Sequence, residues 1–179
     1  MRYFIGYGLH DADKIKVDEF RNEISSIFSV FGALSSPPHI TVVPPFETEN
    51  SEILKTQLSI QVGEQESFSV ETPRFHCFDQ KVWFLDVEQR DELMVLKRNT
   101  EETIKRSLGI REMQNYKPTH FHITLAYKDI SPDLFARIGI FLESKNPPIT
   151  SLTIDNLTLF RFQDGRWFAE SMFGFKKPS

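Results

Sequence analysis

The pattern of apolar positions predicts strands and helices alternating along the chain. Residues 2–9 are rich in Tyr, Phe and Ile and predict an opening strand that ends in a polar turn. Apolar side chains then recur at steps of three and four residues from Val17 to Phe31, which is typical of an amphipathic helix. Gly32 is placed to end this helix. A weaker apolar stripe predicts a second helix over residues 51–60.

Proline residues bracket the next predicted strand. Pro37-Pro38 impose an extended backbone, residues 39–43 are β-branched enough for a strand, and Pro44-Pro45 are expected to end it. Two hairpins are expected further on, because Asp79-Gln80 and Asp164-Gly165 separate strand-like runs. These runs are residues 67–78, 81–87, 152–162 and 167–175, and one more strand is expected over residues 122–127.

Two further helices complete the predicted order of elements. One covers residues 91–108, with Gly109 as its stop. The other begins at Ser131-Pro132, an N-cap residue followed by proline at the first helical position, and is expected to reach Asn146. The order looks like one unit used twice, and no Gly- or Ser-rich linker separates the halves. We therefore predict an α+β fold with antiparallel sheets, in a single domain over residues 1–179.

Composition and charge narrow the class of protein. With 17 Phe in 179 residues, the chain has the material for a packed core. Its formal net charge of −4 gives no general attraction to duplex DNA, so any nucleic-acid contact must be local. The single Cys77 excludes an intrachain disulfide. The first apolar run is too short for a signal peptide, and no run approaches a membrane span. We expect a cytoplasmic monomer without membrane association.

A short motif occurs twice. His39-Ile40-Thr41 and His122-Ile123-Thr124 lie about half a chain apart, and Pro37-Pro38 and Pro118 precede them. Alternate residues of a strand face the same way, so each copy presents one imidazole and one hydroxyl together. If the two halves pack about a pseudo-twofold axis, both faces meet in one cleft.

Two imidazoles and two hydroxyls in one cleft suit the breaking of a phosphodiester bond. Neutral imidazole accepts a proton, imidazolium donates one, and both forms exist near neutral pH. Threonine hydroxyls can donate hydrogen bonds to phosphate oxygens. A single His-x-Thr is more often a packed structural element, but two copies favour catalysis. The candidate catalytic residues are therefore His39 and His122, with Thr41 and Thr124 as substrate-binding residues.

A metal site is the alternative for the second motif, with His120, His122 and Asp129 as ligands. Zinc usually takes four close ligands, or three and a water, and threonine beside each motif histidine is a poor ligand. No Gly-rich phosphate-binding loop is present. We therefore expect neither a metal nor a nucleotide cofactor. His120 itself is expected to be a solvent-exposed residue just before the strand, with a place on the face of His122, extending the polar cleft, as the alternative.

At these motifs the sequence resembles the 2H phosphoesterase superfamily, in its 2′–5′ RNA ligase-like and RNA cyclic phosphodiesterase branch. The first motif is carried by residues 38–46 and the second by residues 122–126. The resemblance implies two pseudo-symmetric lobes with antiparallel sheets lining a central cleft and helices outside. It also implies opening of 2′,3′-cyclic phosphates, or cleavage or joining of 2′–5′ linkages, in RNA ends or small cyclic nucleotides. We assign His39 as the acid and His122 as the base, an order that the sequence does not fix.

Two aromatic residues extend the expected substrate site. Phe46 could stack on a nucleobase, with core packing as the equal alternative, and Tyr127 is a second candidate contact. Tyr127 stands where several members of the resembling family have Arg, and Phe121 stands where many have Pro. The absence of a cation at Tyr127 and the negative net charge of the chain support a second hypothesis. In it the protein is a nucleotide- or RNA-end-binding module with the same cleft and little or no catalysis. A purely structural role has no positive feature in its support.

Overall fold

The computed structural model of the chain describes residues 1–109 and 120–176, which form antiparallel sheets and α-helices. The predicted fold class is thereby confirmed. The strands are β1 (Arg2–Gly8), β2 (His39–Glu47), β3 (Phe68–Glu71), β4 (Phe75–Phe78), β5 (Val82–Asp86), β6 (His122–Tyr127), β7 (Ser151–Ile154), β8 (Asn156–Gln163) and β9 (Arg166–Gly174). The helices are α1 (Asp11–Phe28), α2 (Ser51–Val62), α3 (Asp91–Leu108), α4 (Pro132–Glu143) and the short 3-10 helix η1 (Gly32–Ser35).

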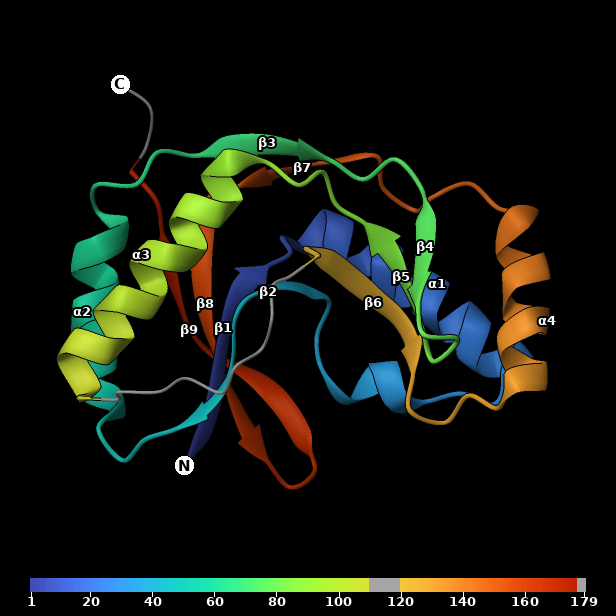
Figure 1. The fold of residues 1–179 in the computed structure, drawn as a ribbon, viewed down its shortest axis with the longest axis horizontal. Coiled ribbons are helices and arrows are strands. Elements are labelled where there is room, and N and C mark those ends of the chain that lie inside the picture. Colours follow the sequence, from blue (N-terminus) through green and yellow to red (C-terminus); the bar gives the residue numbers. More distant parts are fainter. Residues whose placement is uncertain (110–119, 177–179) are drawn as a thin grey trace.

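The order of helices and strands occurs twice along the chain, and elements of the two copies contact each other. β1-α1-β2-α2-β3 is followed, after β4, by β5-α3-β6-α4-β7, and the equivalent strands β3 and β7 pair with each other. One sheet has the order β2-β1-β8-β9 and another β4-β5-β6. Helix α1 packs against β6 and helix α3 against β2, so each long helix packs against a strand of the other copy of the order. Figure 1 shows α2 and α3 at one end of the molecule and α1 and α4 at the other. The division into two lobes stays a prediction.

The first motif strand is longer than predicted. β2 continues through Pro44-Pro45 to Glu47, although these prolines were expected to end it. Proline lacks an N–H donor and is tolerated on an edge strand, and β2 lies at the edge of its sheet. The pairing with β1 shifts register between Tyr3 and Ile5, opposite the prolines. The irregular pairing thus accommodates residues that would break a central strand.

Two predicted strands are each divided in the structure. Residues 67–78 form β3 and β4, separated at Thr72-Pro73-Arg74, and only β4 pairs with β5 as the predicted hairpin. Residues 152–162 form β7 and β8, because the chain leaves one sheet for another at Asp155. Both turns are confirmed by their left-handed backbone: Asp79 and Gln80 have φ of 45° and 52°, and Asp164 and Gly165 have 50° and 81°.

The helices agree with the prediction except at three ends. α3 ends before Gly109 and α4 begins at Pro132 with the Ser131 hydroxyl accepting from Leu134 N, as expected. α4 ends at Glu143 rather than Asn146, and α2 extends to Val62. None of the helices in the described ranges combines the length and apolar character needed to cross a bilayer. Pro118 lies outside the described residues.

α1 ends at Phe28, where Ser29 takes the left-handed conformation that was expected of Gly32. Gly32 instead begins η1 and lies against the end of β6. A Cβ atom at Gly32 would stand 2.1 Å from the carbonyl oxygen of Tyr127. The Asp129 carboxylate accepts hydrogen bonds from the backbone N–H groups of Phe31 (2.6 Å) and Gly32 (3.1 Å). This contact joins the segment before β2 to the end of β6.

The contact at Gly32 predicts a stability difference between two glycine substitutions. Gly32→Ala should lower the free energy of unfolding by more than about 2 kcal/mol, because backbone atoms must move apart. Gly63→Ala is the matched control, since its nearest non-neighbour atom would be 3.4 Å from the new Cβ. That variant should change stability by less than about 1 kcal/mol. Urea unfolding of both variants measures the difference, and equal stabilities would show that η1 does not depend on close approach.

Candidate active site

The two motif strands meet along the edges of different sheets. β2 is the edge strand of one sheet and β6 of another, and the two strands contact each other. His39 is the first residue of β2 and His122 the first residue of β6. In both strands the His and Thr are half-buried while the residue between them is fully buried. Each motif therefore presents its imidazole and hydroxyl on one face, as the sequence predicts.

A cavity of about 850 Å³ opens between the strands. Thr41 from β2 lines it together with His122, Thr124 and Tyr127 from β6. His39 is not among the lining residues; it lies two positions before Thr41 on the same face of β2. The other lining residues are Val42, Pro44, Pro45, Phe78, Asp79, Val82, Lys97, His120 and Phe121. The structure thus brings four predicted site residues together and places His39 beside them.

Both catalytic candidates are held by the same backbone interaction. Nδ1 of His39 donates to the carbonyl oxygen of Pro37 (2.7 Å), and Nδ1 of His122 donates to that of His120 (2.6 Å). A carbonyl has no hydrogen to give, so each Nδ1 must carry the proton. In the neutral ring the lone pair is then on Nε2. Both imidazoles have one defined tautomer, with Nε2 available for proton transfer.

Aromatic rings surround each imidazole and set its protonation. The His39 ring lies 4.5 Å from Phe4 and 5.2 Å from Phe160, measured between centroids. The His122 ring lies 4.9 Å from Phe84 and 5.1 Å from Phe78. Burial lowers the pKa of His39 to about 4, and the nearby Arg21 and His122 act in the same direction. Burial likewise lowers the pKa of His122. Both imidazoles are therefore neutral at pH 7.

The His122 side of the site contains a buried carboxylate. Asp86 on β5 is the cross-strand partner of His122 and is only 6% exposed. It accepts from Nε2 of His120 at 2.5 Å and from Nε of Arg74 at 3.2 Å. His120 lines the cavity, which was the alternative to its expected solvent exposure, and its bond to Asp86 orients the backbone that holds His122. The Gln89 side chain fixes the next peptide by bonding both the N–H and the C=O of Phe121.

A buried arginine holds the segment before His39. Arg21 on α1 is 1% exposed and donates to the carbonyl oxygens of Ala33 (2.5 Å) and Ser36 (3.1 Å). Ser36 comes immediately before Pro37-Pro38, and Ala33 lies one turn earlier, in η1. Because the guanidinium bridges both carbonyls, it fixes the turn that leads into β2. Arg21 is thus a positioning residue for the first motif.

Phe46 and Asp129 do not have the site roles that were considered from the sequence. Phe46, for which stacking on a nucleobase and core packing were equal alternatives, is 8% exposed, packs beside Tyr3 in the core and does not line the cavity. Its position on β2 turns it towards the buried face. Asp129, considered as a metal ligand, is used by the backbone of Phe31 and Gly32. Among the described residues, no three His, Cys, Asp or Glu side chains are grouped to hold a metal ion.

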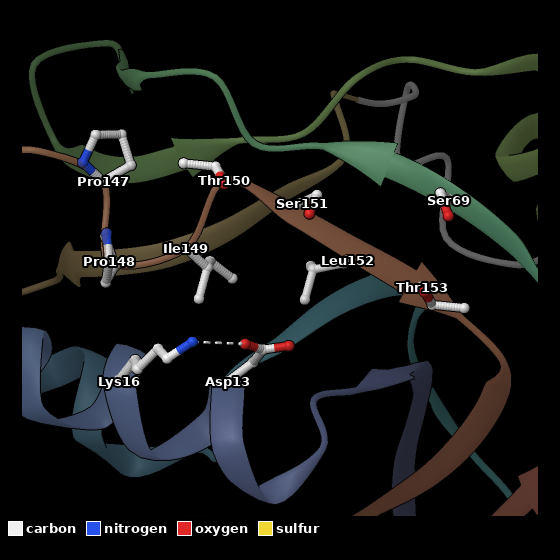
Figure 2. A pocket seen from close by; sticks show the side chains of 10 residues that line it. All are labelled: Asp13, Lys16, Ser69, Pro147, Pro148, Ile149, Thr150, Ser151, Leu152 and Thr153. Carbon is white, nitrogen blue, oxygen red and sulfur yellow. Dashed lines mark hydrogen bonds and ion pairs between the residues drawn. The ribbon is translucent and has the colours of Figure 1, made fainter.

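A second hollow of about 420 Å³ lies between α1 and the strand β7, away from the motifs (Figure 2). It is lined by Ser69, by residues 147–153 and by two charged residues of α1. Those two residues, Asp13 and Lys16, pair with each other at 3.5 Å. Among the described residues, no histidine or cysteine lines this hollow. Of the four motif residues, Thr41, His122 and Thr124 line the larger cavity.

The sequence interpretation also missed Lys97 on α3. This residue lines the cavity and is 8% exposed. Its signal was present in the sequence, since Lys97 lies four residues after Leu93 and three before Thr100, on the apolar stripe of the helix. A charged side chain on that stripe is unusual enough to suggest a role. Asp86 and Gln89 had no comparable signal, because the role of Asp86 follows from the pairing of β5 with β6 and that of Gln89 from its side-chain bonds to Phe121.

Comparison with known proteins adds a family and a fold. A family model described as the 2′-5′ RNA ligase superfamily matches residues 11–166. The structure is similar to that of TT0787 of Thermus thermophilus, with 16% identity and a TM-score of 0.69. It is also similar to E. coli LigT in its apo form, with 17% identity and a TM-score of 0.65. Both comparisons cover 98% of each chain. A search of curated sequences gave no significant match.

The lowered pKa of His39 predicts a loss of stability in acid. The unfolded chain takes up a proton at His39 near pH 6.5, whereas the folded protein does so only near pH 4. The free energy of unfolding should therefore fall as the pH drops through this window, by up to about 1.4 kcal/mol per pH unit from this residue. His39→Asn retains a donor for the Pro37 carbonyl and removes the titration. Urea unfolding between pH 4 and 7 should show a shallower slope for this variant; an unchanged slope would contradict the buried neutral ring.

Proposed function

Because the chain belongs to the 2′-5′ RNA ligase superfamily, we propose that it is a phosphoesterase that uses two histidines to open 2′,3′-cyclic phosphates or to cleave or join 2′–5′ linkages. Family membership supports an enzyme of the phosphoesterase type. The observation that carries the finer proposal is the pair of Nδ1-anchored imidazoles, each with a threonine on its face, on facing strands. Solved structures of E. coli LigT contain 3′-AMP, ATP, NADP+ or phosphate, which supports RNA ends or small nucleotides as substrates.

In the proposed hydrolysis, one imidazole removes a proton from water as the water oxygen bonds to phosphorus. The P–O3′ bond of the cyclic phosphate breaks, and the second imidazole donates its proton to the departing 3′ oxygen. The product carries a 2′-phosphate and a free 3′-hydroxyl, and proton exchange with solvent restores both rings. Thr41 and Thr124 donate hydrogen bonds to the non-bridging oxygens, where negative charge increases. Catalysis without a metal ion and without a cofactor is part of the proposal.

The surroundings of the two rings favour one assignment of the roles. Burial brings the pKa of His39 to about 4, and Arg21 and His122 oppose its protonation further. Burial also lowers the pKa of His122, but the Asp86 carboxylate acts in the opposite direction. A proton taken up by the site therefore binds more readily to His122 than to His39. We assign His39 as the base and His122 as the acid, the reverse of the order taken from the sequence.

Substitution of the motif residues tests the reaction itself. His39→Ala and His122→Ala should each lower kcat/KM on a 2′,3′-cyclic nucleotide by about 10²–10⁴-fold, since each removes one proton-transfer step. Thr41→Val and Thr124→Val keep the side-chain volume and should lower it by about 10- to 100-fold. The wild-type rate should persist in excess EDTA. Absence of wild-type turnover on cyclic nucleotides and on short RNAs with cyclic ends would refute the proposal, and tight binding without turnover would identify a binding module instead.

The assignment of roles has a test of its own. A p-nitrophenyl phosphodiester of a nucleotide has a leaving group that needs no proton, so the acid becomes dispensable. His122→Ala should then lose less than about tenfold in kcat/KM, while His39→Ala should lose at least about 10²-fold. The reversed pattern would exchange the two roles. Equal large losses for both variants would show that His122 does more than protonate the leaving oxygen.

A further inference from the structure

The larger cavity needs a source of positive charge if it is to hold a phosphate. The chain has a formal net charge of −4, so its overall field does not attract anions. Both motif imidazoles are neutral at pH 7 because burial lowers the pKa of each. Asp79 adds a carboxylate to the cavity wall. Among the described residues that line the cavity, Lys97 is the only lysine or arginine.

Lys97 is placed unlike an ordinary helix-surface lysine. Its side chain is 11% exposed, whereas that of Lys14 on α1, which pairs with Asp18 in the same i,i+4 arrangement, is 42% exposed. Burying an ammonium group is costly unless its donors find partners. An ammonium has three donors. Within the described part of the chain, the only acceptor bonded to Nζ of Lys97 is the Glu101 carboxylate.

Helix α1 also carries a buried cation on its apolar stripe, Arg21, whose guanidinium donates to the carbonyls of Ala33 and Ser36. Arg21 does not line the cavity, whereas Lys97 does. Helix α3 packs against β2, the strand that supplies Thr41 to the cavity. Lys97 thus lies on the wall next to a motif strand and retains donor capacity.

Building on the proposed function, we propose that Lys97 binds a phosphate group of the substrate through the ammonium donors that its pair with Glu101 leaves available. The ligand class is a nucleotide or RNA end whose phosphate lies within reach of Nζ. This phosphate is the reacting one or its neighbour along the chain. The sequence lacks a cation at Tyr127, and Lys97 supplies one from a different element.

Phosphate binding tests Lys97 without requiring turnover. Lys97→Met removes the charge and keeps the length of the side chain, and it should raise the Kd for inorganic phosphate by about tenfold at low salt. Lys97→Arg should stay within about threefold of the wild type. Glu101→Gln frees the ammonium and should leave the Kd unchanged or lower it. Lys14→Met is the matched control and should have no effect. Calorimetric titration measures all four variants.

Opposite effects at the two partners separate anion binding from a structural ion pair. If Lys97 and Glu101 only stabilise the helix, Lys97→Met and Glu101→Gln should weaken phosphate binding equally, and that result would overturn the proposal. An unchanged Kd in Lys97→Met would also overturn it. If Lys97→Met does not fold, Lys97→Gln removes the charge with a polar side chain and should raise the Kd for phosphate by a similar factor; an unchanged Kd in that variant would overturn the proposal. A wild type that binds phosphate but turns over no substrate would refute the enzyme proposal and leave the phosphate measurements decisive for Lys97.

The KM for substrates with and without a second phosphate identifies which phosphate is bound. In Lys97→Met, an equal rise in KM for a 2′,3′-cyclic nucleotide with and without a 5′-phosphate places the contact at the reacting phosphate. A larger rise for the 5′-phosphorylated substrate places it at the neighbouring phosphate. Either result supports the proposal. Unchanged KM values for both substrates would contradict it.

Discussion

The hydrogen bond from each motif imidazole to a backbone carbonyl two residues earlier is the interaction on which the site depends. It fixes the ring and puts the proton on Nδ1, so that Nε2 is available on both His39 and His122. The carbonyls themselves are held: Arg21 fixes the turn before Pro37, and Asp86 and Gln89 fix the backbone around His120. Different residues therefore produce the same ring geometry in the two copies. The aromatic walls around both rings keep them neutral, and a bound phosphate would offset this effect because a nearby anion stabilises imidazolium.

Each motif strand packs against the long helix that precedes the other motif strand in the chain. α1 contacts the second motif strand, β6, and α3 contacts the first, β2. η1 adds a third link, since Gly32 lies against the carbonyl of Tyr127 and Asp129 accepts from its N–H. The segment before β2 is thereby tied to the end of β6.

The local sequence pattern was sufficient to predict most helices and strands and the motif residues of the site. Strand ends and the surroundings of individual residues depend on long-range contacts instead. The periodicity of residues 91–108, the cap at Ser131 and the turn at Asp164-Gly165 are set by nearby residues, and the structure confirms them. β2 passes through two prolines because it is an edge strand. Whether Phe46 faces the cavity or the core depends on the register between β1 and β2, which no local pattern gives. Asp86 becomes the neighbour of His122 only through the pairing of β5 with β6.

The central claim is that two distant motifs converge on one anion, and a crystal structure determined with bound phosphate tests it most directly. The account predicts phosphate within hydrogen-bond distance of Nε2 of both His39 and His122 and of the hydroxyls of Thr41 and Thr124. A phosphate bound elsewhere while this position stays empty, or one that reaches only a single motif, would contradict it.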